Sequence, residues 1–185
     1  MAELEHSGGR LYYEHHDGGA SGAPPLVFVH GLTCAHEDWA AQVAHFAPTR
    51  TVVTLDLRGH GQSTDYDSGF DVFTMSEDVA ALLGALDLPP VVLVGHSMGC
   101  RMVLQTARIA PSRVAGVVLV DGSRFAAGDG DAARRRVSEQ IDRTGYVRLL
   151  DSLFDQMFTS ASDTAIRQHI IDRARRMPEA TGRAL

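Results

Sequence analysis

The feature that most constrains the fold is a series of four short apolar runs within the first 120 residues of this 185-residue chain. None shows the polar alternation of a half-exposed strand, and such runs are typical of parallel strands buried on both faces. Helix-length segments separate them, so the chain is built from βαβ units. We therefore predict an α/β fold with a doubly wound, mostly parallel sheet. The runs are Leu26–Val29, Thr51–Leu55, Val91–Val94 and Val117–Val120.

Local signals predict further elements. Leu11–His15 has the composition of a strand and is followed by glycines, which indicates an early strand and a hairpin. Thr74 precedes Glu77 by three residues, so a capping box is expected to open a helix there. Another helix is predicted over about residues 98–110, between the third and fourth runs.

The pattern changes after Asp121, where no further strand signal follows. Apolar residues such as Leu153 and Met157 recur there at helical spacing. We therefore expect two parts: an α/β core over residues 1–125 and a helical cap over residues 126–185 that lies on the sheet.

Composition excludes several classes of protein. The net charge of −6 argues against a non-specific nucleic-acid binder. All 17 basic residues are arginines, so neither a Schiff-base lysine nor a P-loop lysine is available. Two distant cysteines predict neither a disulfide framework nor a zinc site. No residues form a recognisable site for a metal or an organic cofactor, so we expect neither. The chain shows neither a signal peptide nor a membrane-spanning run, which favours a cytoplasmic protein with no membrane partner.

The segment Gly95–Gly99 carries the strongest chemical signal. It reads GHSMG, with an apolar strand ending at Val94 and a helix beginning directly after Ser97. Glycines on both sides allow a sharp strand-to-helix turn that raises the serine hydroxyl above the sheet. The Met98 N–H then lies at a helix N-terminus, where negative charge is stabilised. We predict Ser97 as a nucleophile and the Met98 N–H as a donor to the oxyanion.

A second oxyanion donor is expected from the loop that follows the first apolar run. That loop begins His30-Gly31-Leu32, and Gly31 has the backbone freedom to turn an amide toward the serine. Two donors are needed because the tetrahedral intermediate of acyl transfer places a full charge on its oxygen. The Leu32 N–H is the predicted second donor.

Together with Asp56–Ser63 (DLRGHGQS), the His30-Gly31 pair and the serine turn resemble the α/β-hydrolase superfamily, in the branch that carries a helical cap. The motifs occur in the family's order and at its spacing. This resemblance implies a nucleophilic Ser97 with the Leu32 and Met98 amides as the oxyanion hole. It also implies that the Asp56–Ser63 turn supports the site, and a serine nucleophile speaks against a haloalkane dehalogenase or epoxide hydrolase.

The chain departs from the family pattern in its acid and its base. The family's acid and histidine follow the last strands of the sheet, and no histidine up to His169 is a credible base. Asp121, at the end of the fourth run, is a candidate acid, although it is also placed to cap a turn. Val114–Val120 would form an apolar edge strand, and exposed edges of this kind aggregate. We therefore expect the N-terminal part of an enzyme, completed by a C-terminal segment or a second chain.

The predicted function is that of a serine hydrolase that cleaves a carboxylic ester or related acyl substrate, small and apolar, through an acyl-enzyme. Alternatives on the same fold are a C–C bond hydrolase, a perhydrolase, a cofactor-free oxygenase and a non-catalytic ligand-binding relative. The apolar cap residues are also consistent with simple packing of the cap. Expected pocket residues are His30, Gly31, His96, Phe125, Leu153 and Met157.

Overall fold

A computed structural model describes residues 2–19, 22–122 and 130–184. The chain divides into two compact units between residues 123 and 124. The first unit contains all the described strands, and the second contains only helices among its described residues. Each unit is described by itself below.

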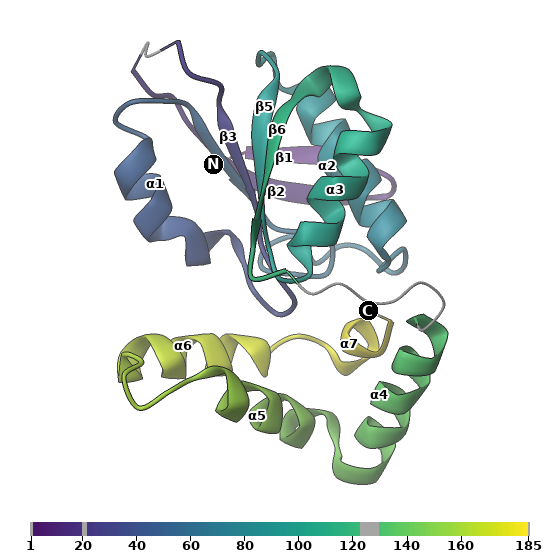
Figure 1. Ribbon diagram of the computed structural model, residues 1–185. Coiled ribbons are helices and arrows are strands. Elements are labelled where there is room, and N and C mark those ends of the chain that lie inside the picture. The colour runs from purple at the N-terminus through teal and green to yellow at the C-terminus, as the bar shows by residue number, and fades with distance from the viewer. Residues whose placement is uncertain (1, 20–21, 123–129, 185) are drawn as a thin grey trace. The chain divides into compact units, whose positions relative to one another are not determined.

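The first unit is built on a six-stranded sheet with the strand order β1-β2-β4-β3-β5-β6 (Figure 1). The first two strands form an antiparallel hairpin, and β2 also pairs antiparallel with β4. The remaining neighbours pair in parallel, so the mostly parallel sheet predicted from the apolar runs is confirmed. The strands are β1 Ala2–His6, β2 Gly9–His16, β3 Leu26–Val29, β4 Val52–Leu55, β5 Val91–His96 and β6 Val114–Val120.

Helices cover both faces of this sheet. Figure 1 shows α1 on one face and α2 and α3, which contact each other, on the opposite face. The sandwich explains why every residue of β3 and of β4 is buried, Thr54 included, as their mainly apolar sequences predict. The helices are η1 His36–Trp39, α1 Ala40–Phe46, α2 Val72–Ala85, α3 Gly99–Ile109 and η2 Pro111–Arg113.

Helix α2 begins earlier than the sequence pattern predicts. Its N-cap is Asp71, whose carboxylate accepts the N–H groups of Phe73 and Thr74 at 2.9 and 3.1 Å. The predicted capping box opening at Thr74 is therefore wrong. Asp71 is the N-cap because its backbone is extended, at φ −129°, and its negative charge is stabilised at the helix N-terminus. Thr74 therefore lies inside the first turn of the helix.

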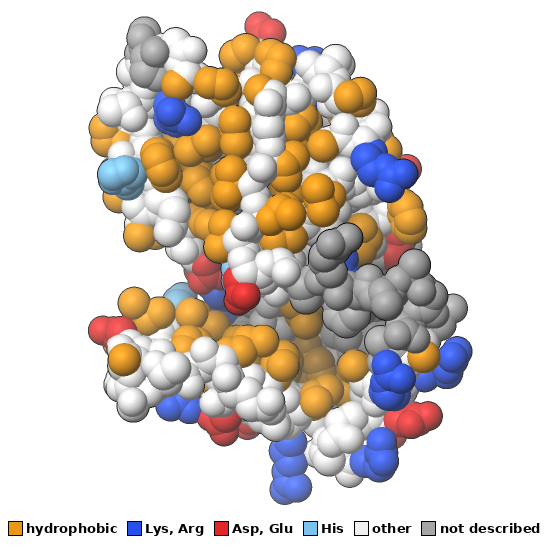
Figure 2. Space-filling view, in the orientation of Figure 1, with side chains coloured by type: hydrophobic (Ala, Val, Ile, Leu, Met, Phe, Trp, Pro, Cys, Tyr) orange, Lys and Arg blue, Asp and Glu red, His pale blue; other side chains and the backbone are white. Residues whose placement is uncertain are grey.

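Strand β6 lies at the edge of the sheet, paired only with β5 among the described strands. Its last residues are apolar yet exposed, with 45% of Val118, 49% of Leu119 and 39% of Val120 accessible to solvent. Figure 2 shows hydrophobic side chains spread over this side of the first unit. The edge therefore has the composition of an interior strand.

The second unit is a small helical bundle with a core of its own. Tyr146, Leu150 and Phe154 of one helix pack against Ile171 and Ala174 of another. In the described residues of the chain, no helix combines the length and the apolar character that crossing a membrane requires. The helices are α4 Gly130–Thr144, α5 Tyr146–Met157, α6 Thr164–Ala174 and α7 Glu179–Ala184.

Candidate active site

Ser97 occupies the turn between β5 and α3, in a backbone conformation that L-residues rarely adopt. Its φ is +49°, in the left-handed region. The Ser97 N–H donates to the Val120 carbonyl at 2.9 Å, and the Ser97 carbonyl accepts the Cys100 N–H at 3.1 Å. The turn is thus attached to β6 on one side and to the first turn of α3 on the other.

Glycines on either side of Ser97 allow α3 to approach the sheet closely. A Cβ on Gly99 would overlap the carbonyl oxygens of Val29 and His30, and one on Gly95 would lie 2.5 Å from the Gly99 carbonyl oxygen. Real Cβ atoms do not make such contacts, so both positions require glycine. The spacing of the two glycines therefore serves a packing need around the serine.

The loop that follows β3 passes directly beside this turn. A Cβ on Gly31 would lie 3.1 Å from the Ser97 Cβ and 3.0 Å from His96 Nδ1. Among the described residues, the structure records no acceptor for the backbone N–H of Leu32 or of Met98. The structure thus places Gly31 beside His96 and Ser97. The roles of Leu32 and Met98 as oxyanion donors stay predictions.

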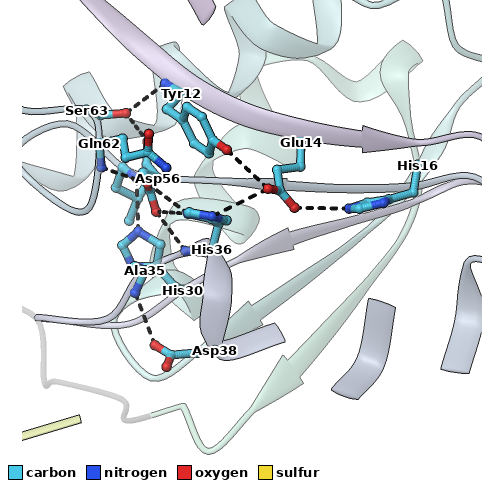
Figure 3. A network of polar contacts seen from close by, with 11 residues as sticks. Tyr12, Glu14, His16, His30, Ala35, His36, Asp38, Asp56, Gln62 and Ser63 are labelled. Carbon is cyan, nitrogen blue, oxygen red and sulfur yellow. Dashed lines mark hydrogen bonds and ion pairs between the residues drawn. The ribbon is translucent and has the colours of Figure 1, made fainter. Parts of the chain in front are cut away.

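The Asp56–Ser63 turn contacts this loop through buried polar groups (Figure 3). Asp56 is fully buried and accepts the Gln62 N–H at 2.8 Å, while its own carbonyl accepts the Ser63 hydroxyl at 2.9 Å. A Cβ on Gly61, whose φ is +50°, would overlap the Asp56 carboxylate. The glycine at that position is therefore needed for the turn to close around a buried charge.

Sequence reasoning missed the partner of that charge, which is His36. The His36 N–H donates to Asp56 Oδ1 at 2.7 Å, and its Nδ1 lies 2.9 Å from Asp56 Oδ2. Burial alone would lower the pKa of His36, but the bond to Asp56 and the nearby Glu14 raise it above its usual value. Burial alone would raise the pKa of Asp56, yet His36 and backbone donors lower it. The one signal in the sequence was the position of Asp56 directly after a buried strand, because a buried carboxylate there needs a partner.

A second buried ion pair lies nearby and was also not predicted. Arg58 forms a two-pronged interaction with Asp78 of α2, with both N–O distances at 2.5 Å, and both side chains are almost fully buried. The Arg58 guanidinium also lies 4.4 Å from the centre of the Tyr66 ring. This pair ties the segment after β4 to α2 and has no contact with Ser97 in the described structure.

Asp121, the candidate acid, directly follows the residue whose carbonyl accepts the Ser97 N–H. Its φ is +49° and its side chain is exposed. Within the first unit, no hydrogen bond joins any described histidine to the Ser97 hydroxyl, and His30 and His60 are instead buried with ring centres 5.0 Å apart. The roles of acid and base stay predictions.

The expected pocket residues beyond the first unit have different surroundings. Phe125 lies outside the described residues. Leu153 is half-buried on α5, and Met157 at the end of that helix is 60% exposed. Their neighbour Phe154 packs inside the second unit's own core, so part of the apolar pattern is explained by packing alone. The described residues contain no cluster of side chains suited to hold a metal ion.

The sheet is open and mostly parallel, and its interior strand β5 leads through Ser97, in a left-handed conformation, directly into α3. This arrangement defines a class of α/β proteins in which a serine occupies a sharp turn between a strand and a helix. The chain belongs to the alpha/beta hydrolase fold family, whose model matches residues 24–161. The resemblance stated from the motifs is therefore confirmed.

Similar proteins carry several activities. The chain is 42% identical over 113 residues to a dihydrolipoyllysine-residue acetyltransferase component of an acetoin cleaving system from Pseudomonas putida, covering 61% of this chain and 30% of that protein. It is 41% identical over 115 residues to a non-heme chloroperoxidase from Streptomyces lividans, covering 61% and 41%. The structure of a thermophilic esterase from Thermogutta terrifontis matches with a TM-score of 0.80 and 26% identity, covering 95% of this chain and 65% of that one.

Lipases and lactonases also occur among the similar proteins. The chain spans about a third to a half of the length of the curated relatives it matches. The comparisons therefore define a hydrolase family and leave its particular reaction open.

Proposed function

We propose that the protein is a serine hydrolase that cleaves a carboxylic ester or a related acyl compound through an acyl-enzyme on Ser97. One observation carries the proposal: Ser97 sits in a left-handed turn at the head of α3, with Gly31 of the neighbouring loop directly against it. A serine so placed is accessible at a helix N-terminus, where developing negative charge is stabilised. The likeness to esterases and lipases supports this reading.

In the proposed reaction the Ser97 oxygen attacks the acyl carbon while a base takes the hydroxyl proton. The carbonyl oxygen becomes an oxyanion, which accepts hydrogen bonds from the Leu32 and Met98 N–H groups. Collapse of the intermediate expels the alcohol, protonated by the base, and water then releases the acid by the same steps. We assign the base to a histidine outside these 185 residues and keep Asp121 as the candidate acid.

The substrate class we propose is a small apolar acyl compound. Leu153 and Met157 carry apolar side chains that are not fully buried, and their contact with the substrate stays a prediction from the sequence. The alternative of simple cap packing predicts no change in substrate preference on replacing either residue.

The test is covalent labelling with a fluorophosphonate, an acyl mimic that reacts with activated serines. The protein expressed from its native gene should be labelled on Ser97, and Ser97→Ala should abolish both the labelling and the hydrolysis of p-nitrophenyl esters. Ser112→Ala, at an exposed serine in η2, is the matched control and should retain both. Labelling that survives Ser97→Ala would contradict the proposal.

A perhydrolase is the second candidate, because the relative from Streptomyces lividans is a non-heme chloroperoxidase. Both reactions would use the same serine, with hydrogen peroxide replacing water as the second nucleophile. Peroxide-dependent halogenation that exceeds ester hydrolysis, and that is lost in Ser97→Ala, would favour it.

A further inference from the structure

The loop that carries Leu32 is held at both ends by side chains that bind consecutive residues of one segment. At its start, His30 Nε2 accepts the Leu57 N–H at 3.0 Å. At its end, His36 binds the carboxylate of Asp56, the residue just before Leu57. Both histidines are almost fully buried. The two ends of the loop are therefore held by two consecutive residues, Asp56 and Leu57, which follow β4 directly.

The two supports differ in chemistry. His30 Nε2 is an acceptor, and its Nδ1 lies 2.8 Å from the Gly31 carbonyl oxygen, which fits a neutral ring with its proton on Nδ1. His36 instead faces carboxylates: Asp56 on one side and, at 3.7 Å from Nε2, Glu14 of β2 on the other. The His36 end of the loop is held by an ion pair with Asp56.

The surroundings of His36 keep the pair out of water. The Tyr12 ring lies 4.8 Å from the His36 ring, centre to centre, and the Tyr12 hydroxyl donates to Glu14 at 3.1 Å. Glu14 also binds His16 at 3.2 Å, as Figure 3 shows. On its own element His36 is followed by Glu37. A protonated His36 is thus enclosed by negative charges from β2, from Asp56 directly after β4, and from η1.

From this geometry we infer that His36 and Asp56 form an ion-pair clamp that positions the loop carrying the Leu32 amide, and so act as positioning residues for the oxyanion hole. The inference rests on the proposed function for its catalytic consequence, since the Leu32 N–H matters only if an oxyanion forms. Between its clamped ends the loop makes a turn in which the Cys34 N–H donates to the Gly31 carbonyl at 3.2 Å. Loss of the clamp frees the segment next to Ser97.

The clamp gives the loop a defined pH window. The raised pKa of His36 means that its contribution is complete below the ordinary histidine pKa and is lost as the pH rises through the raised value. The lowered pKa of Asp56 means that its contribution is complete above the ordinary aspartate pKa and is lost as the pH falls through the lowered value. Both charges are present between these limits.

The experiment compares amide hydrogen exchange and ester kinetics in four forms of the protein expressed from its native gene: wild type, His36→Phe, His36→Asn and His15→Asn. His36→Phe keeps a ring without a donor or a charge, and His36→Asn keeps a donor near Nδ1. His15 is the control, because it is an exposed histidine on the same strand as Glu14, paired only with Asp17 at 3.2 Å among the described residues.

We expect His36→Phe to raise exchange over residues 31–36 by about tenfold or more and to lower kcat by at least about tenfold, with KM little changed. His36→Asn should recover part of both losses, and His15→Asn should match wild type. Unchanged exchange in the loop, or an equal rise in β3 and β5, would overturn the clamp. Loop-specific exchange in a chain that never hydrolyses esters would support the clamp and refute the proposed function instead.

If His36→Phe does not fold, an NMR titration of the wild-type protein tests the clamp instead. In wild-type protein, the amide chemical shifts of residues 31–36 should titrate together with the His36 ring protons, because ring and loop change together. Independent titration of the ring, without movement of the loop amides, would overturn the inference.

Discussion

Strained backbone at the residue scale is concentrated around the candidate site. Four described residues other than glycine have positive φ values, and three of them, Thr33, Ser97 and Asp121, belong to the loop after β3, the serine turn and the end of β6. Each such conformation costs about 1–2 kcal/mol. Strain of this kind persists only where surrounding contacts enforce it, and it gathers where side chains or amides must be aimed.

Position 32 offers a direct test of the backbone amide at the residue scale. Leu32→Pro removes the N–H and should lower kcat for ester hydrolysis by about 10²–10³-fold, the usual cost of one oxyanion donor. Leu32→Ala keeps the N–H and should retain most of kcat. Steady-state kinetics check the difference, and thermal unfolding of both variants serves as the control. Equal kcat values in two folded variants would exclude the Leu32 amide from the oxyanion hole.

At the scale of elements, the contact of α3 with β3 sets the position of the serine. Gly99 of the helix meets the Val29 and His30 carbonyls, so the helix N-terminus is pressed against the strand whose loop supplies Leu32. One contact therefore links the helix that carries Met98 to the loop that carries the other predicted donor.

A pair of glycine substitutions tests this element contact. Gly99→Ala should lower the free energy of unfolding by about 1–3 kcal/mol, because the added methyl overpacks the contact with β3. Gly84→Ala, in the last turn of α2 with nothing within 4 Å of the added methyl, should raise it by up to about 0.5–1 kcal/mol. Urea unfolding measures both. A tolerated Gly99→Ala would mean that the helix can move away without cost.

At the scale of the whole molecule, the exposed apolar edge of β6 dominates the expected behaviour in solution. Strand edges with free N–H and C=O groups and apolar side chains pair with other chains. In this chain the edge strand also accepts the Ser97 N–H through Val120, so its environment acts directly on the serine turn.

We expect the 185-residue chain in isolation to self-associate through β6. Leu119→Lys places a charge on the exposed edge and should reduce the associated fraction, as sedimentation velocity over a range of concentrations would show. Ile166→Lys, at a residue of the second unit that is 60% exposed, is the matched control and should change little. Equal association of the two variants would place the contact elsewhere.

Apolar pattern and local motif, both properties of the sequence by itself, determined the parallel sheet, the serine turn and the family. A strand buried on both faces must be mainly apolar, and a strand-to-helix turn around Ser97 must have small residues beside it, so both leave a direct trace in the sequence. The outcomes at β3, β4 and Gly95–Gly99 follow from these local requirements.

Only the tertiary structure decided which polar groups meet. His36 and Asp56 are separated by 20 residues, as are Arg58 and Asp78, and nothing in their spacing encodes the pairing. The choice of Asp71 over Thr74 as N-cap likewise depended on where the incoming chain becomes extended. The His36–Asp56 pair forms because the sheet order brings the ends of β3 and β4 together, and Arg58 meets Asp78 because α2 packs near the segment after β4. A buried charge needs a partner among the groups within reach.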